Sequence, residues 1–120
     1  MEAHEGPKLL LELGGQAAEY APLFFEEDGS YTTFLLGTQP GCDFVCAGEY
    51  ASRQHAQLVF ARNDFFLVDS STNGTFIQTE DEQVSHVHRC KIRLWGAGWI
   101  SLGTPLNSGI PIYFQQISSS

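Results

Sequence analysis

The fold is decided by residues 52–75, SRQHAQLVFARNDFFLVDSSTNGT, in which two apolar runs lead into a polar loop. His55–Phe60 and Phe65–Asp69 are rich in aromatic and β-branched residues, so each predicts a short strand. Ala61–Asp64 joins the two runs at the length of a hairpin connection. Ser70–Gly74, which follows, is too polar to be a core element. This stretch therefore predicts an antiparallel strand pair that ends in a polar loop.

Similar short runs, separated by turn signals, continue on both sides of this stretch. The further predicted strands are Leu9–Leu13, Tyr31–Leu36, Asp43–Cys46, Thr75–Gln78, Val84–Leu94, Trp99–Leu102 and Ile110–Ile117. Helical periodicity is poor throughout, and the best helical candidate, Gly14–Tyr20, is short and bounded by Gly and Pro. The sequence predicts an all-β fold, an antiparallel β-sandwich of two packed sheets with polar loops at its ends.

Size and charge narrow the function. A chain of 120 residues is long enough for one domain and too short for two comfortable ones. Its net charge is −8, and residues 1–49 hold nine acids against the single base Lys8. Without a basic stripe, we expect neither nucleic-acid binding nor attraction to an anionic membrane. The longest apolar runs, such as Phe65–Val68, are far too short to insert into a membrane.

The cysteines and the chain ends indicate the compartment and the domain limits. Cys42, Cys46 and Cys90 form neither a CxxC pair nor a disulfide framework, so we expect free thiols in a reducing, cytoplasmic setting. Acids at the start of the chain stand where a secretory signal needs bases. We expect a flexible segment at residues 1–7, a domain at 8–117 and a disordered tail at 118–120.

Two polar clusters stand out in the β-like sequence: residues 52–55, Ser-Arg-Gln-His, and residues 70–75, Ser-Ser-Thr-Asn-Gly-Thr. With Leu36-Gly37 and residues 42–45 upstream, their order resembles the forkhead-associated (FHA) domain, whose pattern runs Gly-Arg, Ser-x-x-His and Asn-Gly. The resemblance covers about residues 8–117. It implies a sandwich of about 10–11 strands whose loops bind phosphothreonine peptides, with no enzymatic activity and no cofactor.

The residue chemistry fits this expectation. A phosphate dianion needs hydroxyls, backbone N–H groups and guanidinium, and Ser52, Thr72 and Arg53 provide such side chains. Asn73 offers a donor and an acceptor for the backbone of an extended peptide, and Gly74 allows the loop to turn. The alternative is structural, because Ser and Thr commonly cap loops and Asn-Gly is a common turn dipeptide.

One position departs from the family pattern. The resemblance places an arginine on the phosphate directly after Gly37, and this chain has Thr38 there. The predicted peptide-binding residues are Thr38, Ser52, Arg53, Thr72 and Asn73, supported by Gly37, His55 and Gly74. We expect weak recognition of a phosphothreonine peptide in Ser/Thr-kinase-linked signalling. The alternative is a protein-interaction or regulatory domain that does not depend on phosphate.

The histidines of the chain could serve a structural, a catalytic or a metal-binding role, and their spacing in the sequence bears on each. His55 is expected to be buried and hydrogen-bonded to loop backbone. Ser52 and His55 are three residues apart and have no assigned acid, so the pair does not indicate a hydrolase. His86 and His88 would share one face of a strand, but Cys90 lies about 13 Å from His86 in an extended chain and cannot join the same ion. We therefore predict no metal site.

The C-terminal part carries a finer resemblance. Leu94, Gly96, Gly98, Ile100 and Gly103 match a Leu-x-Gly-x-Gly-x-Ile-x-x-Gly run found in FHA domains attached to bacterial class III adenylate or guanylate cyclases. This resemblance implies that a cyclase catalytic domain is a possible partner in the same parent chain.

Overall fold

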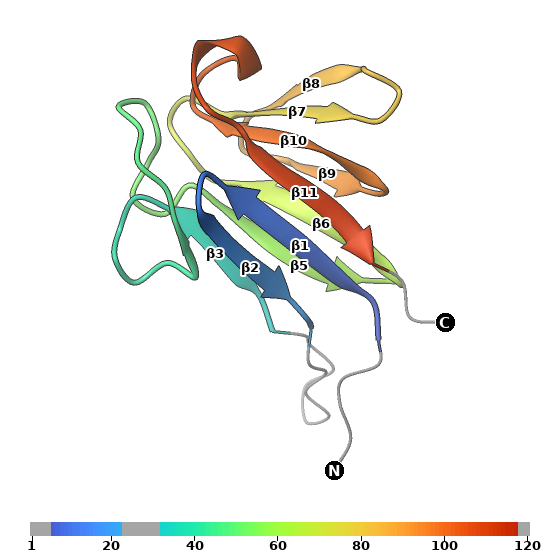
Figure 1. Ribbon diagram of the computed structural model, residues 1–120. Helices are drawn as coiled ribbons and strands as arrows, with labels where there is room; N and C mark the ends of the chain where they lie inside the picture. The colour runs from blue at the N-terminus through green and yellow to red at the C-terminus, as the bar shows by residue number, and fades with distance from the viewer. Residues whose placement is uncertain (1–5, 23–31, 118–120) are drawn as a thin grey trace.

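The computed structural model describes residues 6–22 and 32–117, which form two β-sheets packed face to face (Figure 1). In chain order the strands are β1 (Lys8–Leu13), β2 (Gln16–Tyr20), β3 (Phe34–Gly37), β4 (Phe44–Val45), β5 (Ala56–Ala61), β6 (Asp64–Asp69), β7 (Thr75–Thr79), β8 (Val84–Val87), β9 (Lys91–Leu94), β10 (Ala97–Leu102) and β11 (Ile112–Ile117). A single turn of 3-10 helix, η1 (Leu106–Ser108), is the only helical element in these ranges. The predicted all-β sandwich is confirmed.

The strands divide into a six-stranded sheet, β2-β1-β11-β10-β7-β8, and a five-stranded sheet, β4-β3-β5-β6-β9. The sheets are antiparallel, as predicted, except at one edge, where β3 and β4 pair in parallel with Leu36 opposite Phe44. The loop between β3 and β4 brings the chain back to the start of β3, so that β4 runs in the same direction beside it. After β4, the Cys46 N–H donates to the Gly37 carbonyl at 2.8 Å.

The core lies between the sheets and follows from the period-2 alternation of the strands. In β5 and β6, Leu58, Phe65 and Leu67 are fully buried, and Ile100 and Phe114 meet them from the other sheet. Burying each such side chain contributes roughly 1.5–3 kcal/mol. The hairpin predicted from residues 52–75 is present, with Phe60 opposite Phe65.

Two segments differ from what periodicity suggested. Gly14–Tyr20, the best helical candidate, contains β2 instead, because Gly14 turns the chain at a φ of +60° and β2 then pairs with β1. Val84–Leu94, a single alternating stretch in the sequence, is two strands in two different sheets. The break falls at Arg89, whose φ of 60° lies in the left-handed region. Alternation alone does not reveal a change of sheet.

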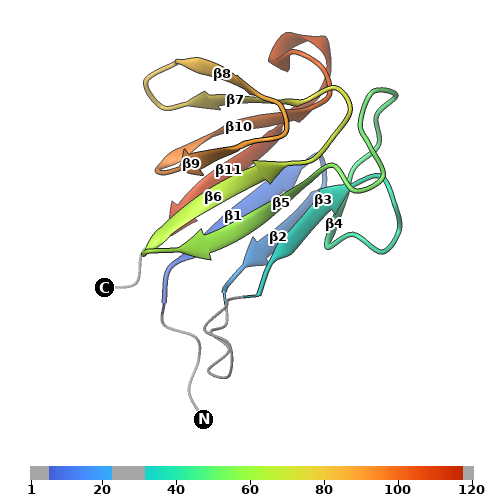
Figure 2. The same ribbon diagram turned by 180° about the vertical axis from the view of Figure 1, so that it is seen from behind.

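The loops that follow β3, β4 and β6 gather at one end of the sandwich, away from the start of β1 and the end of β11, as Figures 1 and 2 show from opposite sides. The segments expected to be flexible, 1–7 and 118–120, lie outside the described residues apart from Gly6 and Pro7. Tyr31, the first residue of the predicted strand Tyr31–Leu36, also lies outside them. In the described part of the chain, no helix has the length and apolar character needed to cross a membrane.

Candidate functional site

Three loops meet at Ser52, one of the predicted binding residues. The Thr72 N–H donates to the Ser52 hydroxyl oxygen at 3.3 Å, and the Thr38 N–H donates to the Ser52 carbonyl at 3.1 Å. The hydroxyl accepts from Thr72, so its own proton stays available to donate. The structure therefore places Thr38, Ser52 and Thr72 side by side at the loop end of the sandwich.

Asn73 is held from two sides. Its side-chain nitrogen donates to the Tyr50 carbonyl at 3.0 Å, and its own carbonyl accepts from the His86 ring nitrogen Nε2 at 3.2 Å. The His86 ring in turn stacks on Phe76, with centroids 4.2 Å apart. Asn73 is exposed, and its amide keeps one N–H donor and the Oδ1 acceptor without a partner among the described residues.

Arg53 lies next to Ser52 and is fixed through its backbone only. Its carbonyl accepts from the Gln39 N–H at 3.1 Å and from the Cys42 thiol at 3.2 Å. The side chain is exposed and makes no hydrogen bond or ion pair with the described residues. The guanidinium of Arg53 is therefore exposed and has no partner among the described residues.

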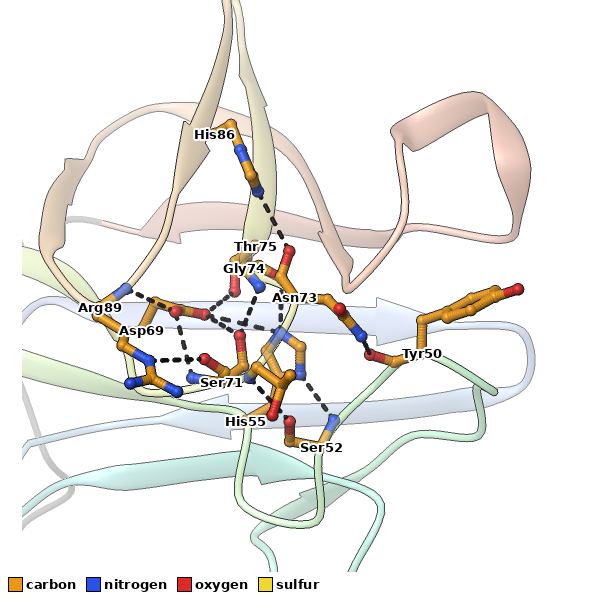
Figure 3. Close-up of polar contacts among 11 residues, drawn as sticks. Tyr50, Ser52, His55, Asp69, Ser71, Asn73, Gly74, Thr75, His86 and Arg89 are labelled. Carbon is orange, nitrogen blue, oxygen red and sulfur yellow. Dashed lines mark hydrogen bonds and ion pairs between the residues drawn. The ribbon is translucent and has the colours of Figure 1, made fainter.

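Beneath this surface His55 is fully buried, as predicted, and both ring nitrogens are engaged (Figure 3). The Ser52 N–H donates to Nδ1 at 2.9 Å, so Nε2 carries the proton and donates to the Gly74 carbonyl at 2.8 Å. Burial lowers the pKa of His55 below its ordinary value, against the opposing effects of the Gly74 carbonyl and of Asp69. Neutral His55 thus ties the Ser52 loop to the Gly74 loop.

Asp69, at the end of β6, organises the second loop. Its carboxylate accepts from the hydroxyls of Ser71 and Thr75 at 2.8 and 2.7 Å, and from the backbone N–H groups of Ser71 and Arg89 at 3.2 and 2.8 Å (Figure 3). Burial alone would raise the pKa of Asp69, but these hydrogen bonds outweigh it, and the pKa lies below its ordinary value. Asp69 is therefore a buried carboxylate that holds the loop before Thr75.

Two glycines are required by close approach. A Cβ at Gly37 would lie 2.0 Å from the Arg53 carbonyl oxygen, so no side chain fits between the β3 end and the Ser52 loop. Gly74 has a φ of +87°, and a Cβ there would lie 2.3 Å from the His86 ring nitrogen. Both positions allow the loops to touch.

The arrangement does not form a nucleophile–base pair. His55 accepts from the backbone N–H of Ser52 and not from its hydroxyl, and its other nitrogen is bonded to Gly74. Neither ring nitrogen is left to take a proton from Ser52. The site is built to hold loops in place.

Sequence reasoning missed several members of this network: Tyr50, Asp69, Ser71, Thr75 and Arg89. An available signal was the pattern of an acid at a strand end followed by Ser and Thr, which is typical of local capping. Nothing local to Arg89 indicated that its N–H would reach Asp69, twenty residues away.

A groove of about 610 Å³ adjoins Asn73, between the Tyr50 loop and the β10–β11 connection. Its lining includes Tyr50, which is 53% exposed, and Ile110, which is 80% exposed, together with Leu102 and Ile112. The groove therefore offers exposed apolar side chains, together with several hydroxyl-bearing residues, beside the polar site.

The five residues of the finer C-terminal resemblance all have structural roles. Leu94 and Ile100 are core residues, and Gly96 and Gly103 have φ values of 63° and 87°. A Cβ at Gly98 would lie 2.1 Å from the Gln78 carbonyl. Packing within this domain accounts for the run without a second domain.

The chain is similar to known proteins in both sequence and structure. Residues 34–94 match the family model of the FHA domain. The Mycobacterium tuberculosis Rv1747 FHA-1 structure has a TM-score of 0.71 at 20% identity, covering 92% of this chain and 97% of that chain. The FHA domain of the Chlamydia trachomatis protein CT664 has a TM-score of 0.62 at 20% identity, covering 94% and 99%.

A third structure contains a ligand. The N-terminal FHA domain of Saccharomyces cerevisiae Rad53p, in complex with a phosphothreonine peptide, has a TM-score of 0.64 at 18% identity, covering 92% of this chain and 93% of that chain. A search among curated proteins gives no significant match. At these identities the structural likeness establishes the fold.

Proposed function

The chain belongs to the FHA domain family, and from this premise we propose that it binds a phosphothreonine peptide at its loop end without catalysing a reaction. FHA domains are interaction modules that bind such peptides. The observation that carries the proposal is Ser52, whose hydroxyl lies where three loops join and keeps its proton for a ligand.

The phosphate would be held by charge-assisted hydrogen bonds. Ser52 and Thr72 offer hydroxyls and Arg53 a free guanidinium, which suit the oxygens of a phosphate dianion. Asn73 would bind the peptide backbone through Oδ1 as acceptor and through the amide N–H that is not bound to Tyr50. The proposed ligand is therefore an extended peptide that lies across the loops.

The affinity is expected to be weak because Thr38 stands where the family has an arginine. A hydrogen bond to a charged group contributes roughly 1.5–3 kcal/mol, so its loss weakens binding about ten- to a hundredfold. We expect a dissociation constant on the order of tens to hundreds of micromolar. The groove beside Asn73 would receive a side chain of the peptide on one side of the phosphothreonine.

The second candidate is a protein-interaction domain that does not read phosphate. Thr38 favours it, because this residue removes a cation from the pocket of a chain whose net charge is −8. In this reading the domain regulates a nucleotide cyclase in the same parent chain. Both candidates place the domain in the cytoplasm.

Calorimetric titration with one threonine peptide, phosphorylated and unphosphorylated, separates the two. The first function predicts that only the phosphorylated form binds, that Ser52→Ala removes most of the binding, and that Thr38→Arg tightens it by up to about a hundredfold. Equal binding of both peptides, unchanged by Thr38→Arg, would favour the second candidate.

A further inference from the structure

We propose that Arg89, in the turn between β8 and β9, supplies a second cation to the bound phosphate and partly replaces the arginine absent at Thr38. The inference rests on the proposed phosphopeptide function and assigns that site a residue outside its sequence motifs. Arg89 is placed beside the site by the fold alone.

The chain has six Lys and Arg residues, all of which are described, and few of them are near the site. Four of them are engaged or located elsewhere. Lys8 pairs with Glu19, Arg62 turns the β5–β6 hairpin, Lys91 lies over the Phe66 ring, and Arg93 pairs with Asp64 and lies over the Trp95 ring. Arg53 and Arg89 are the two that remain near the loop end.

Arg89 is held in place through both its backbone and its side chain. Its backbone N–H donates to the Asp69 carboxylate at 2.8 Å, and its side-chain Nε donates to the Ser71 carbonyl at 3.3 Å (Figure 3). Its φ of 60° is uncommon for a residue with a side chain, and such conformations persist where surrounding contacts hold them. The same carboxylate therefore fixes both Arg89 and the Ser71 segment.

Arg89 is also close in the structure to the segment that carries the hydroxyl groups of the proposed site. Ser71, which binds the Arg89 side chain, directly precedes Thr72, and the Thr72 N–H is bonded to the Ser52 hydroxyl oxygen. The side chain of Arg89 is exposed, and its two terminal nitrogens make no hydrogen bond with the described residues. Through Ser71, Arg89 is therefore held one residue away from Thr72, within the loop that would contact the phosphate.

The charge of the phosphate explains why a second arginine would matter for binding. A phosphothreonine carries close to two negative charges at neutral pH. Arg53 alone balances half of this charge, in a chain with a large acidic excess. Arg89 would supply the remainder, although its Nε bond to Ser71 restricts how far its guanidinium can move.

The test is calorimetric titration of the whole domain with a phosphothreonine peptide. Arg89→Gln should weaken binding about tenfold or more. Arg93→Gln is the matched control, because it makes the same change in net charge on a strand away from the site, and its affinity should stay within about twofold of wild type. A thermal melt of each variant reports whether the fold is retained.

Two further variants separate a direct phosphate contact from loop positioning. Arg89→Lys keeps the charge without the Nε bond and should keep more affinity than Arg89→Gln. In Thr38→Arg/Arg89→Gln the cation is moved to position 38, and binding should recover to at least the wild-type level. The affinity of Arg89→Gln should also depend less on salt concentration than that of wild type.

The outcomes distinguish the two proposals. If wild type binds the phosphopeptide and Ser52→Ala does not, while Arg89→Gln binds like wild type, the role of Arg89 is refuted and the phosphopeptide function stands. If Arg89→Gln is weak but Thr38→Arg fails to rescue it, Arg89 only positions the loop. If wild type does not discriminate the phosphorylated peptide, the proposed function itself fails.

Discussion

The loop end of the sandwich has a buried layer and an exposed outer layer, which are built from the same chain segments. In the buried layer His55, Asp69, Ser71 and Thr75 are each at most 2% exposed and fully hydrogen-bonded. In the outer layer Arg53, Thr72 and Asn73 are exposed. The segment after β6 alternates between the layers, with Ser71 inside and Thr72 outside. We therefore expect substitutions in the outer layer to weaken ligand binding with little effect on stability, whereas substitutions in the buried layer should lower stability first.

The largest expected effect on stability is that of Asp69→Ala. Its removal leaves the hydroxyls of Ser71 and Thr75 and two backbone N–H groups without their buried acceptor. Each buried unsatisfied group costs about 1–3 kcal/mol, so we expect a loss of more than about 3 kcal/mol in the free energy of unfolding. Urea denaturation measures this, with Asp64→Ala as a surface control. A loss no larger than the control would show that the layer is not needed for folding.

His55→Ala should have a smaller effect, a loss of about 1–3 kcal/mol, because it leaves the Ser52 N–H and the Gly74 carbonyl unpaired. The same denaturation measurement applies, together with a phosphopeptide titration. Since His55 joins the two binding loops, the folded variant should also bind more weakly. Wild-type affinity in a destabilised His55→Ala would contradict a link between the layers.

How much of this could be read from the sequence differs by layer. The outer residues belong to short motifs, Ser52-Arg53 and Thr72-Asn73, so their placement together was predictable from the family pattern. In the inner layer the burial of His55 was predicted, but the long-range contact from Arg89 to Asp69 was not, because no local spacing encodes it. The sandwich followed from alternation, whereas the parallel β3–β4 edge and the sheet change at Arg89 depend on loop geometry.

The pH dependence of stability is the next effect in size. His55 has a folded pKa below its ordinary value of 6.5, so its contribution is full above that pH and is lost as pH falls through the folded pKa. Asp69, with a pKa lowered from 3.8, adds a second loss in stronger acid. Denaturation from pH 8 to pH 3 should show both phases, and His55→Gln should remove the first. A wild type whose stability is constant down to about pH 5 would contradict the neutral His55.

Arg53→Ala should have the smallest effect on stability and thereby separates the layers most clearly. The side chain is exposed and makes no hydrogen bond or ion pair with the described residues. The backbone carbonyl of residue 53, which accepts hydrogen bonds from the Gln39 N–H and the Cys42 thiol, remains in the variant. We therefore expect a change in unfolding free energy within about 0.5 kcal/mol, the usual range for surface substitutions. Phosphopeptide affinity should nevertheless fall about tenfold or more, since a charge-assisted bond is lost. Arg62→Ala, an exposed arginine in the β5–β6 turn, is the control for charge. If Arg53→Ala instead unfolds the domain at much lower urea, the guanidinium belongs to the structural layer, and the separation by exposure is wrong.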